Sequence, residues 1–95
     1  MRPVSPGEVL REQLDELGMS ASALAKALHV PTNRITGILN GTRSLTAETA
    51  LRLERCFNGS TAQFWLNLQT NYDLRQAQIE ASESLRSIRP LKRLS

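Results

Sequence analysis

The residues best suited to chemistry lie between positions 19 and 45, in the run MSASALAKALHVPTNRITGILNGTRSL. This run carries Lys26, Arg34 and Arg43 but no Asp or Glu. Threonine and asparagine side chains, which can hydrogen-bond to base edges, stand among these cations. A stretch that carries only positive charge is expected on a surface that faces a polyanion. The run therefore indicates a surface for DNA.

Basic charge is segregated along the chain. The 95 residues include 12 Lys+Arg and 9 Asp+Glu, which gives a net charge of +3. Residues 1–16 and 48–83 each carry a net −2, whereas residues 17–47 carry +3 and residues 84–95 carry +4. A purely solvated surface does not require this arrangement. In the basic segment 17–47 no acid opposes the cations, and binding to DNA is predicted there.

Apolar spacing and helix-capping residues predict five helices and an all-α fold. Ser5 and Glu8 have the spacing of a capping box at the start of the first helix. Ser20 or Ser22 can cap the second helix, and Thr46 can cap the fourth. The expected helices run from Pro6 to Gly18, from Ser20 to Leu28, from Pro31 to about Asn40, from Thr46 to Phe57, and from about Thr61 to Ala77.

The second and third of these helices fit a helix-turn-helix. Ala25 is small enough for the third helix to cross closely, and Ile35 and Ile38 can hold that helix against the core. The turn needs a residue with positive φ, usually glycine. Here the position is His29, which enters the left-handed region more readily than branched residues do. The side of the third helix opposite Ile35 and Ile38 is therefore predicted to face outward.

This outward side is predicted to read DNA bases. The N-terminal residues of a recognition helix reach base edges in the major groove. Asparagine can bind adenine bidentately, and threonine offers a hydroxyl or a methyl group to thymine. Glycine would permit close approach, and arginine can reach phosphate or guanine. The predicted DNA-binding residues are Thr32, Asn33, Arg34, Thr36, Gly37, Arg43 and Lys26. An ordinary polar helix face is the alternative.

The fifth predicted helix, TAQFWLNLQTNYDLRQA, carries most of the aromatic residues. Ser60 and Gln63 are expected to form a capping box at its start. Its apolar residues spread beyond one stripe, so this helix must pack on two sides. One side could meet a second subunit, or both sides could meet the core of the same subunit. In the first case, the interface residues would be Phe64, Trp65, Leu68 and Tyr72.

The chain is predicted to form one helix-turn-helix domain with a packing and dimerisation helix over residues 1–79, followed by a basic tail over residues 80–95. The tail has weak amphipathic spacing that Pro90 interrupts, so a mobile segment is expected.

Catalysis has little support. The only histidine, His29, is distant in sequence from the only cysteine, Cys56, and no glycine-rich phosphate loop is present. We expect no enzymatic activity, no cofactor and no metal site. The sequence has neither a signal-like start nor 18 consecutive apolar residues, so we expect no membrane partner and a cytoplasmic location.

The segments VPTNRITGILNGTRSLTAETALRLERCF and STAQFWLNLQTNYDL resemble HigA-type antitoxins of the Xre helix-turn-helix family, and the likeness covers roughly Pro6 to Ala77. The resemblance implies a lambda-repressor-like fold. It also implies a homodimer that represses its own operon by binding double-stranded operator DNA and neutralises a HigB-type mRNA endonuclease toxin. His29 departs from the usual turn glycine. A solitary Xre-type regulator, or a module that binds a toxin without DNA, remains an alternative.

Overall fold

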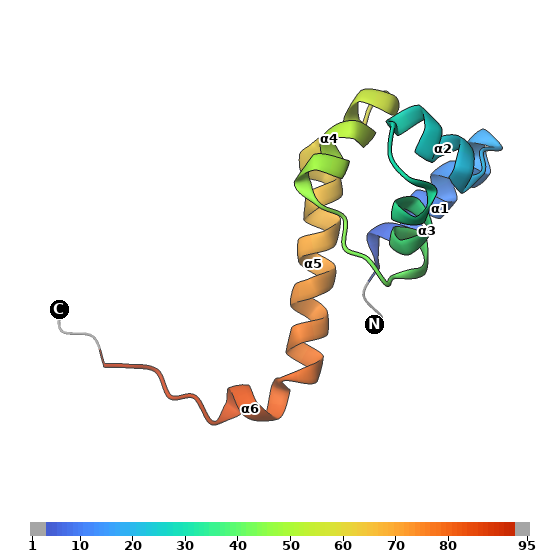
Figure 1. Ribbon diagram of the computed structural model, residues 1–95. Helices are drawn as coiled ribbons and strands as arrows, with labels where there is room; N and C mark the ends of the chain where they lie inside the picture. Colours follow the sequence, from blue (N-terminus) through green and yellow to red (C-terminus); the bar gives the residue numbers. More distant parts are fainter. Residues whose placement is uncertain (1–3, 93–95) are drawn as a thin grey trace.

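The computed structural model describes residues 4–92 and contains only helices in that part of the chain (Figure 1). The helices are α1 (Pro6–Leu17), α2 (Ala21–Leu28), α3 (Thr32–Asn40), α4 (Ala47–Cys56), α5 (Ala62–Glu80) and α6 (Ser82–Arg86). The five predicted helices are all present. The short α6 lies in the segment expected to be a tail, of which positions 93–95 fall outside the described residues. No helix in the described part has the length and apolar character to cross a membrane.

Local capping sets most of the helix boundaries. The Ser5 and Glu8 capping box is present, with Glu8 N–H donating to Ser5 Oγ over 3.3 Å and Ser5 N–H donating to Glu8 Oε2 over 2.9 Å. Of the two serines considered for α2, Ser20 is the cap and accepts from Ala23 N–H. Thr46 caps α4 by accepting from Thr49 N–H. These three caps confirm the predicted starts.

The predicted capping box at the start of α5 is wrong. Thr61 is the N-cap, because its hydroxyl accepts from Phe64 N–H over 3.1 Å. Ser60 Oγ instead accepts from the indole N–H of Trp65 over 3.2 Å. The helix also continues to Glu80, three residues beyond the expected end.

One hydrophobic core joins α1 to α5. It is formed by twelve buried apolar side chains: Leu10, Leu14, Leu24, Ala25, Leu28, Ile35, Ile38, Leu45, Ala50, Leu53, Phe57 and Trp65. Trp65 has no exposed surface, and its ring centroid lies 6.3 Å from that of Phe57. A side chain that is buried inside its own subunit has no surface to offer to a second one. The placement of Trp65 in a dimer interface is therefore wrong, and the residue belongs to the subunit core.

The crossing of α1 and α3 depends on Gly7. A Cβ atom at this position would overlap with the carbonyl oxygen of Ile38 and would lie 2.9 Å from that of Leu39. Neither oxygen can move without moving the α3 backbone. Any side chain at position 7 would therefore push α3 away from α1, so Gly7 helps to set where α3 lies on the body.

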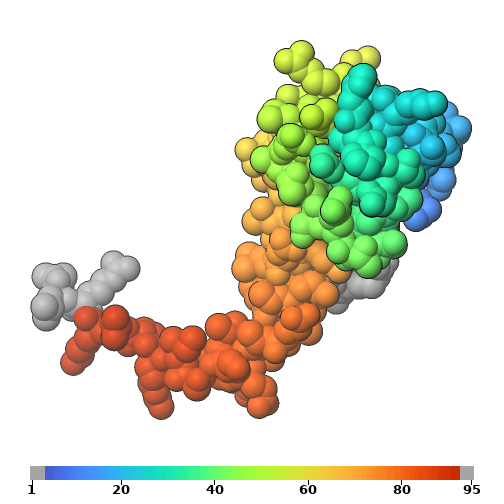
Figure 2. Space-filling view, in the orientation of Figure 1, coloured from blue at the N-terminus to red at the C-terminus, as the bar shows by residue number. Residues whose placement is uncertain are grey.

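The molecule has two parts of different character, visible in Figures 1 and 2. The helical body comprises α1 to α4 and α5 as far as Tyr72. The C-terminal arm comprises residues 73–92, which continue α5 away from the body and then bend through α6. No residue of the arm is buried, and Leu74 and Ile79 are both 57% exposed. The chain spans 54 Å in its longest direction because of this arm.

Candidate DNA-binding surface

The turn between α2 and α3 forms without glycine. His29 adopts φ 60° and ψ 45°, in the left-handed region, and ends α2. Its backbone N–H donates to the carbonyls of Lys26 and Ala25, and Val30 N–H also donates to Ala25 O over 3.0 Å. These bonds satisfy the last carbonyls of α2 in the usual way for a helix end. The helix-turn-helix geometry is thus obtained although the expected glycine is missing.

Helix α3 has a buried side and an exposed side, as predicted. Ile35 and Ile38 are 0% and 3% exposed and hold the helix against the body. Thr32, Asn33 and Thr36 are exposed on the other side. Thr36 Oγ donates to Asn33 O over 3.4 Å, which uses the hydroxyl proton and leaves the oxygen able to accept a hydrogen bond. The two threonines and the asparagine are therefore available to a groove of DNA.

The N-terminus of α3 is open. Pro31 is the N-cap and provides no side-chain hydrogen bond, so no side chain covers the first N–H groups of the helix. Such groups carry partial positive charge and bind phosphate or other anions. A proline side chain cannot accept a hydrogen bond, which is why no side chain caps this end of the helix.

Gly37 does not lie where it was predicted. It is buried, and a Cβ atom there would lie 3.0 Å from Arg43 Cβ and 3.6 Å from Thr42 Oγ. Its carbonyl accepts from the N–H groups of Thr42 and Arg43. The loop after α3 therefore folds back over Gly37, and the glycine makes room for that loop rather than for DNA. The prediction failed because helical spacing describes only contacts within the helix.

Asn40 is hydrogen-bonded to the same loop. Its side-chain oxygen accepts from Thr42 N–H over 3.1 Å and from Thr42 Oγ over 2.7 Å. These bonds fix the turn at Gly41, which has φ 84°. As a result, the loop presents Arg43 beside α3 from a defined position.

Arg34 has an acidic partner that a linear count of charges does not show. Arg34 Nη1 donates to Glu48 Oε1 over 3.0 Å, from α3 to the first turn of α4. The same carboxylate oxygen accepts from Arg52 Nε over 3.4 Å, and Arg52 Nη1 donates to Leu28 O over 2.9 Å. The idea that the cations between positions 17 and 47 are unopposed is therefore wrong for Arg34.

The charge state of Glu48 follows from these contacts. Arg52 first, and Arg34 second, lower the pKa of the Glu48 carboxyl below its usual value of 4.5. Glu48 is therefore ionised at neutral pH. Neither Glu48 nor Arg52 was predicted as a site residue, although their spacing of four on one helix is a recognisable ion-pair signal.

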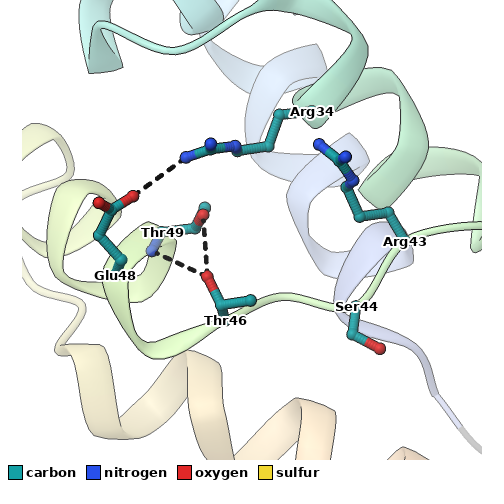
Figure 3. Close-up of a pocket in the computed structure, with 6 residues that line it drawn as sticks. All are labelled: Arg34, Arg43, Ser44, Thr46, Glu48 and Thr49. Atoms are coloured by element: carbon teal, nitrogen blue, oxygen red, sulfur yellow. Dashed lines mark hydrogen bonds and ion pairs between the residues drawn. The ribbon is translucent and has the colours of Figure 1, made fainter.

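Arg34 and Arg43 line one recess of about 290 Å³ at the junction of α3, the following loop and α4 (Figure 3). Ser44, Thr46, Glu48 and Thr49 complete the lining. In Figure 3 the Arg34 guanidinium points to Glu48, whereas Arg43 extends toward Arg34 without a drawn partner. The recess has a net positive charge, because it is lined by two guanidinium groups and one carboxylate. It lies next to the exposed side of α3. Lys26 is exposed in the last turn of α2.

The remaining residues predicted for an interface lie along α5. Phe64 is 42% exposed and packs edge-on against Trp65, with 5.3 Å between ring centroids. Leu68 and Tyr72 are half-buried. Between them, Gln69 Oε1 accepts from Leu45 N–H over 2.7 Å and ties α5 to the segment before α4. One side of α5 thus packs on the body, and Phe64 keeps part of its ring in solvent.

Comparison with known proteins adds to this geometry. Residues 10–64 match the helix-turn-helix family HTH_3. The chain is 52% identical to virulence-associated protein I of Dichelobacter nodosus over 92 residues, which are 96% of this chain and 83% of that protein. A solved HigA-family addiction module antidote protein from Coxiella burnetii is 52% identical, with a TM-score of 0.90 and coverage of 96% of this chain and 100% of that one. The antitoxin HigA of Pseudomonas aeruginosa, solved with the higBA promoter, is 40% identical, with a TM-score of 0.89 over 96% of this chain and 100% of its own.

Proposed function

Because the chain belongs to the helix-turn-helix family HTH_3, and within it to the HigA-type antitoxins, we propose that it is a sequence-specific DNA-binding repressor that also serves as an antitoxin. In this role it binds the operator of its own operon in the cytoplasm and neutralises a HigB-type mRNA endonuclease. The family and the all-α fold agree with the sequence prediction.

The exposed side of α3 carries this proposal. Asn33 and Thr36 face solvent above the buried Ile35 and Ile38, and the open helix N-terminus and the arginine-lined recess lie beside them. Hydrogen-bonding side chains in the centre and cations at the edge are the combination needed for base contacts and phosphate contacts, respectively. The relative from Pseudomonas aeruginosa, solved with its promoter, supports the same use of the fold.

A homodimer follows from the same proposal, with α5 as the interface. We assign Phe64, Leu68 and Tyr72 to it, without Trp65, which is buried in the subunit. The exposed apolar side chains of the arm, among them Leu74, would extend this interface. A two-fold dimer presents two α3 helices to DNA, so the operator should contain an inverted repeat with half-sites about 34–36 Å apart, or a multiple of that distance.

The direct test uses the DNA upstream of the reading frame that encodes the chain. Purified protein should shift this DNA at a stated salt concentration and should not shift a scrambled duplex of the same length and composition. Co-expression with the adjacent reading frame should yield a stable complex that suppresses RNA cleavage. DNA binding without any such partner would favour the solitary regulator, and complex formation without DNA binding would favour the protein-interaction module.

The dimer has its own test. Phe64→Glu should lower the mass measured by analytical ultracentrifugation to that of a monomer while the circular dichroism spectrum stays helical, since Phe64 is partly in solvent. Gln63→Glu, at the exposed neighbouring position, is the matched control for the added charge. If the Phe64→Glu protein remains dimeric, the interface must lie outside this part of α5.

A further inference from the structure

Glu48 links the exposed recognition helix to the rest of the body. It accepts from Arg34 on α3 and from Arg52 on α4, and Arg52 also donates to the last carbonyl of α2. Both helices of the helix-turn-helix are therefore connected to one carboxylate outside the motif. Among the ion pairs of the described residues, the pair between Glu48 and Arg34 is the one that reaches α3.

The pair between Arg34 and Glu48 is exposed enough to exchange partners. The Arg34 side chain is 31% exposed and that of Glu48 is 62% exposed. Exposed ion pairs contribute little to stability because water and salt compete for both charges. An uncharged guanine base beside α3 can therefore take Arg34 from Glu48, whereas Arg52 keeps Glu48 in place through the second bond.

We propose that Glu48 is a specificity determinant for DNA that acts through Arg34. It is a positioning residue, because it need not touch DNA itself. On DNA of arbitrary sequence, Arg34 remains paired with Glu48 and adds nothing to binding. On the operator, Arg34 leaves Glu48 for a stronger contact. This inference rests on the proposed function of the α3 surface.

The physical reason lies in what each kind of DNA can offer. Non-operator DNA offers Arg34 only a phosphate, and the nearby carboxylate both neutralises Arg34 and repels that phosphate. The affinity for non-operator DNA comes almost entirely from phosphate contacts, so one masked cation lowers it directly. An operator base pair such as G·C offers a bidentate acceptor pair that can replace the carboxylate. Breaking the ion pair costs the same on both kinds of DNA, but Glu48 repels a phosphate and does not repel an uncharged guanine base. Glu48 therefore weakens non-operator binding more than operator binding.

The test is Glu48→Gln, which keeps the shape of the side chain and removes its charge. Binding is measured by fluorescence anisotropy on the upstream operator duplex and on the scrambled duplex, over a range of salt concentrations. Affinity for the scrambled duplex should rise about fivefold near physiological salt, and its salt dependence should steepen by about 0.9, the value for one additional phosphate contact. Operator affinity should change by less than about twofold, because there Glu48→Gln removes only the small cost of breaking an exposed ion pair.

Two further variants separate masking from a general gain of positive charge. Glu16→Gln on α1 changes the net charge equally and should leave both affinities near wild type. In an Arg34→Gln background, Glu48→Gln should no longer raise affinity for the scrambled duplex. If affinity for the scrambled duplex still rose in that background, or if affinity rose equally on both duplexes, the proposal would be overturned. A general repulsion between Glu48 and DNA would then explain the result.

The outcome also separates this inference from the proposed function. A wild-type protein that does not prefer the operator contradicts the DNA-binding function and the role of Glu48 with it. A wild-type protein that prefers the operator, with an unchanged ratio of affinities in Glu48→Gln, contradicts only the role of Glu48. Thermal unfolding monitored by circular dichroism shows that each variant is folded.

Discussion

The helical body and the C-terminal arm contain the same kinds of apolar residue but use them differently. In the body, most leucines and isoleucines are buried, such as Leu10 and Ile35 at 0% exposure, and Leu17 and Leu51 are the exposed exceptions at 55% and 54%. In the arm, Leu74 and Ile79 are 57% exposed and Ile88 is 68% exposed. The difference does not come from residue type. It comes from whether a second helix of the same chain lies opposite.

Helix α5 contains both situations within one element. Its first part carries Trp65, which is completely buried, and Gln69, which is bonded to the segment before α4. Its last part, from residue 73 onward, has no buried residue. Helix propensity therefore extends α5 beyond the region in which packing supports it, and the apolar surface of the arm is left for another molecule.

The largest expected effect tests this difference within α5 itself. Trp65→Ala should destabilise the body by about 3–5 kcal/mol, because a large buried side chain is lost and a cavity remains. Leu74→Ala, nine residues further along the same helix, should change stability by no more than about 0.5 kcal/mol in the monomer. Urea unfolding followed by circular dichroism measures both. Similar losses in the two variants would mean that the arm is packed in solution.

A second effect concerns the way in which the body brings α1 and α3 together. Gly7→Ala should cost about 1–3 kcal/mol, because the added methyl group meets two backbone carbonyls of α3. The change should also weaken DNA binding, since it moves α3. Gly59→Ala is the useful comparison, because it has open space but φ 91°. Gly59→Ala should therefore lower stability but leave DNA affinity unchanged. Equal losses of DNA affinity in the two variants would contradict the role given to Gly7.

A third effect separates the two parts by function. Asn33→Ala should cost about 1–3 kcal/mol in operator binding and relax the preference at one base pair, whereas stability stays near wild type. Asn71→Ala, at an exposed position on α5 away from α3, is the control and should leave operator binding unchanged. Competition with operators mutated at single positions measures the preference. If Asn33→Ala retained wild-type discrimination at every position, base reading would have to be assigned to other side chains.

Local signals in the sequence were sufficient for most of the body. Ser5, Ser20 and Thr46 each lie within three residues of the N–H group that they cap, so local sequence determines these helix starts. The exposed position of Asn33 follows similarly from the spacing of Ile35 and Ile38. Such features depend on neighbours along one helix, which helical periodicity describes well.

Apart from the N-cap of α5 and the Glu48–Arg52 pair, which are local, the features that sequence reasoning missed depend on contacts between separate segments of the chain. Gly37 is covered by a loop that returns after α3, and Gly7 is required by a helix about thirty residues further along. Arg34 is paired with a carboxylate fourteen residues away. Trp65 could not be assigned to core or interface because its helix is apolar on several sides. Contacts between elements decide each case, and helical spacing carries no information about them.

The smallest expected effect compares an ion pair of the body with one of the arm. In the body, Glu48 has two arginine partners that lower the pKa of its carboxyl below 4.5. In the arm, Glu83 lies 3.6 Å from Arg86, and both side chains are largely exposed. A carboxyl whose pKa is lower in the folded than in the unfolded protein contributes stability above the unfolded pKa, and this stability is lost as the pH falls through the folded pKa.

Glu48→Gln should therefore lower the Tm slightly at pH 7, and the gap to wild type should close as the pH falls below about 4.5, because protonation then removes the same charge from the wild-type protein. Glu83→Gln should leave the Tm unchanged at every pH, since α6 packs against no part of the body that unfolds with it. Thermal melts by circular dichroism between pH 7 and pH 3 measure both series. A constant gap for Glu48→Gln would mean that the charge of Glu48 is not the source of the lost stability. A pH-dependent gap for Glu83→Gln would mean that the arm folds against the body or a second subunit. The conclusion that the body is stable without the arm would then be wrong.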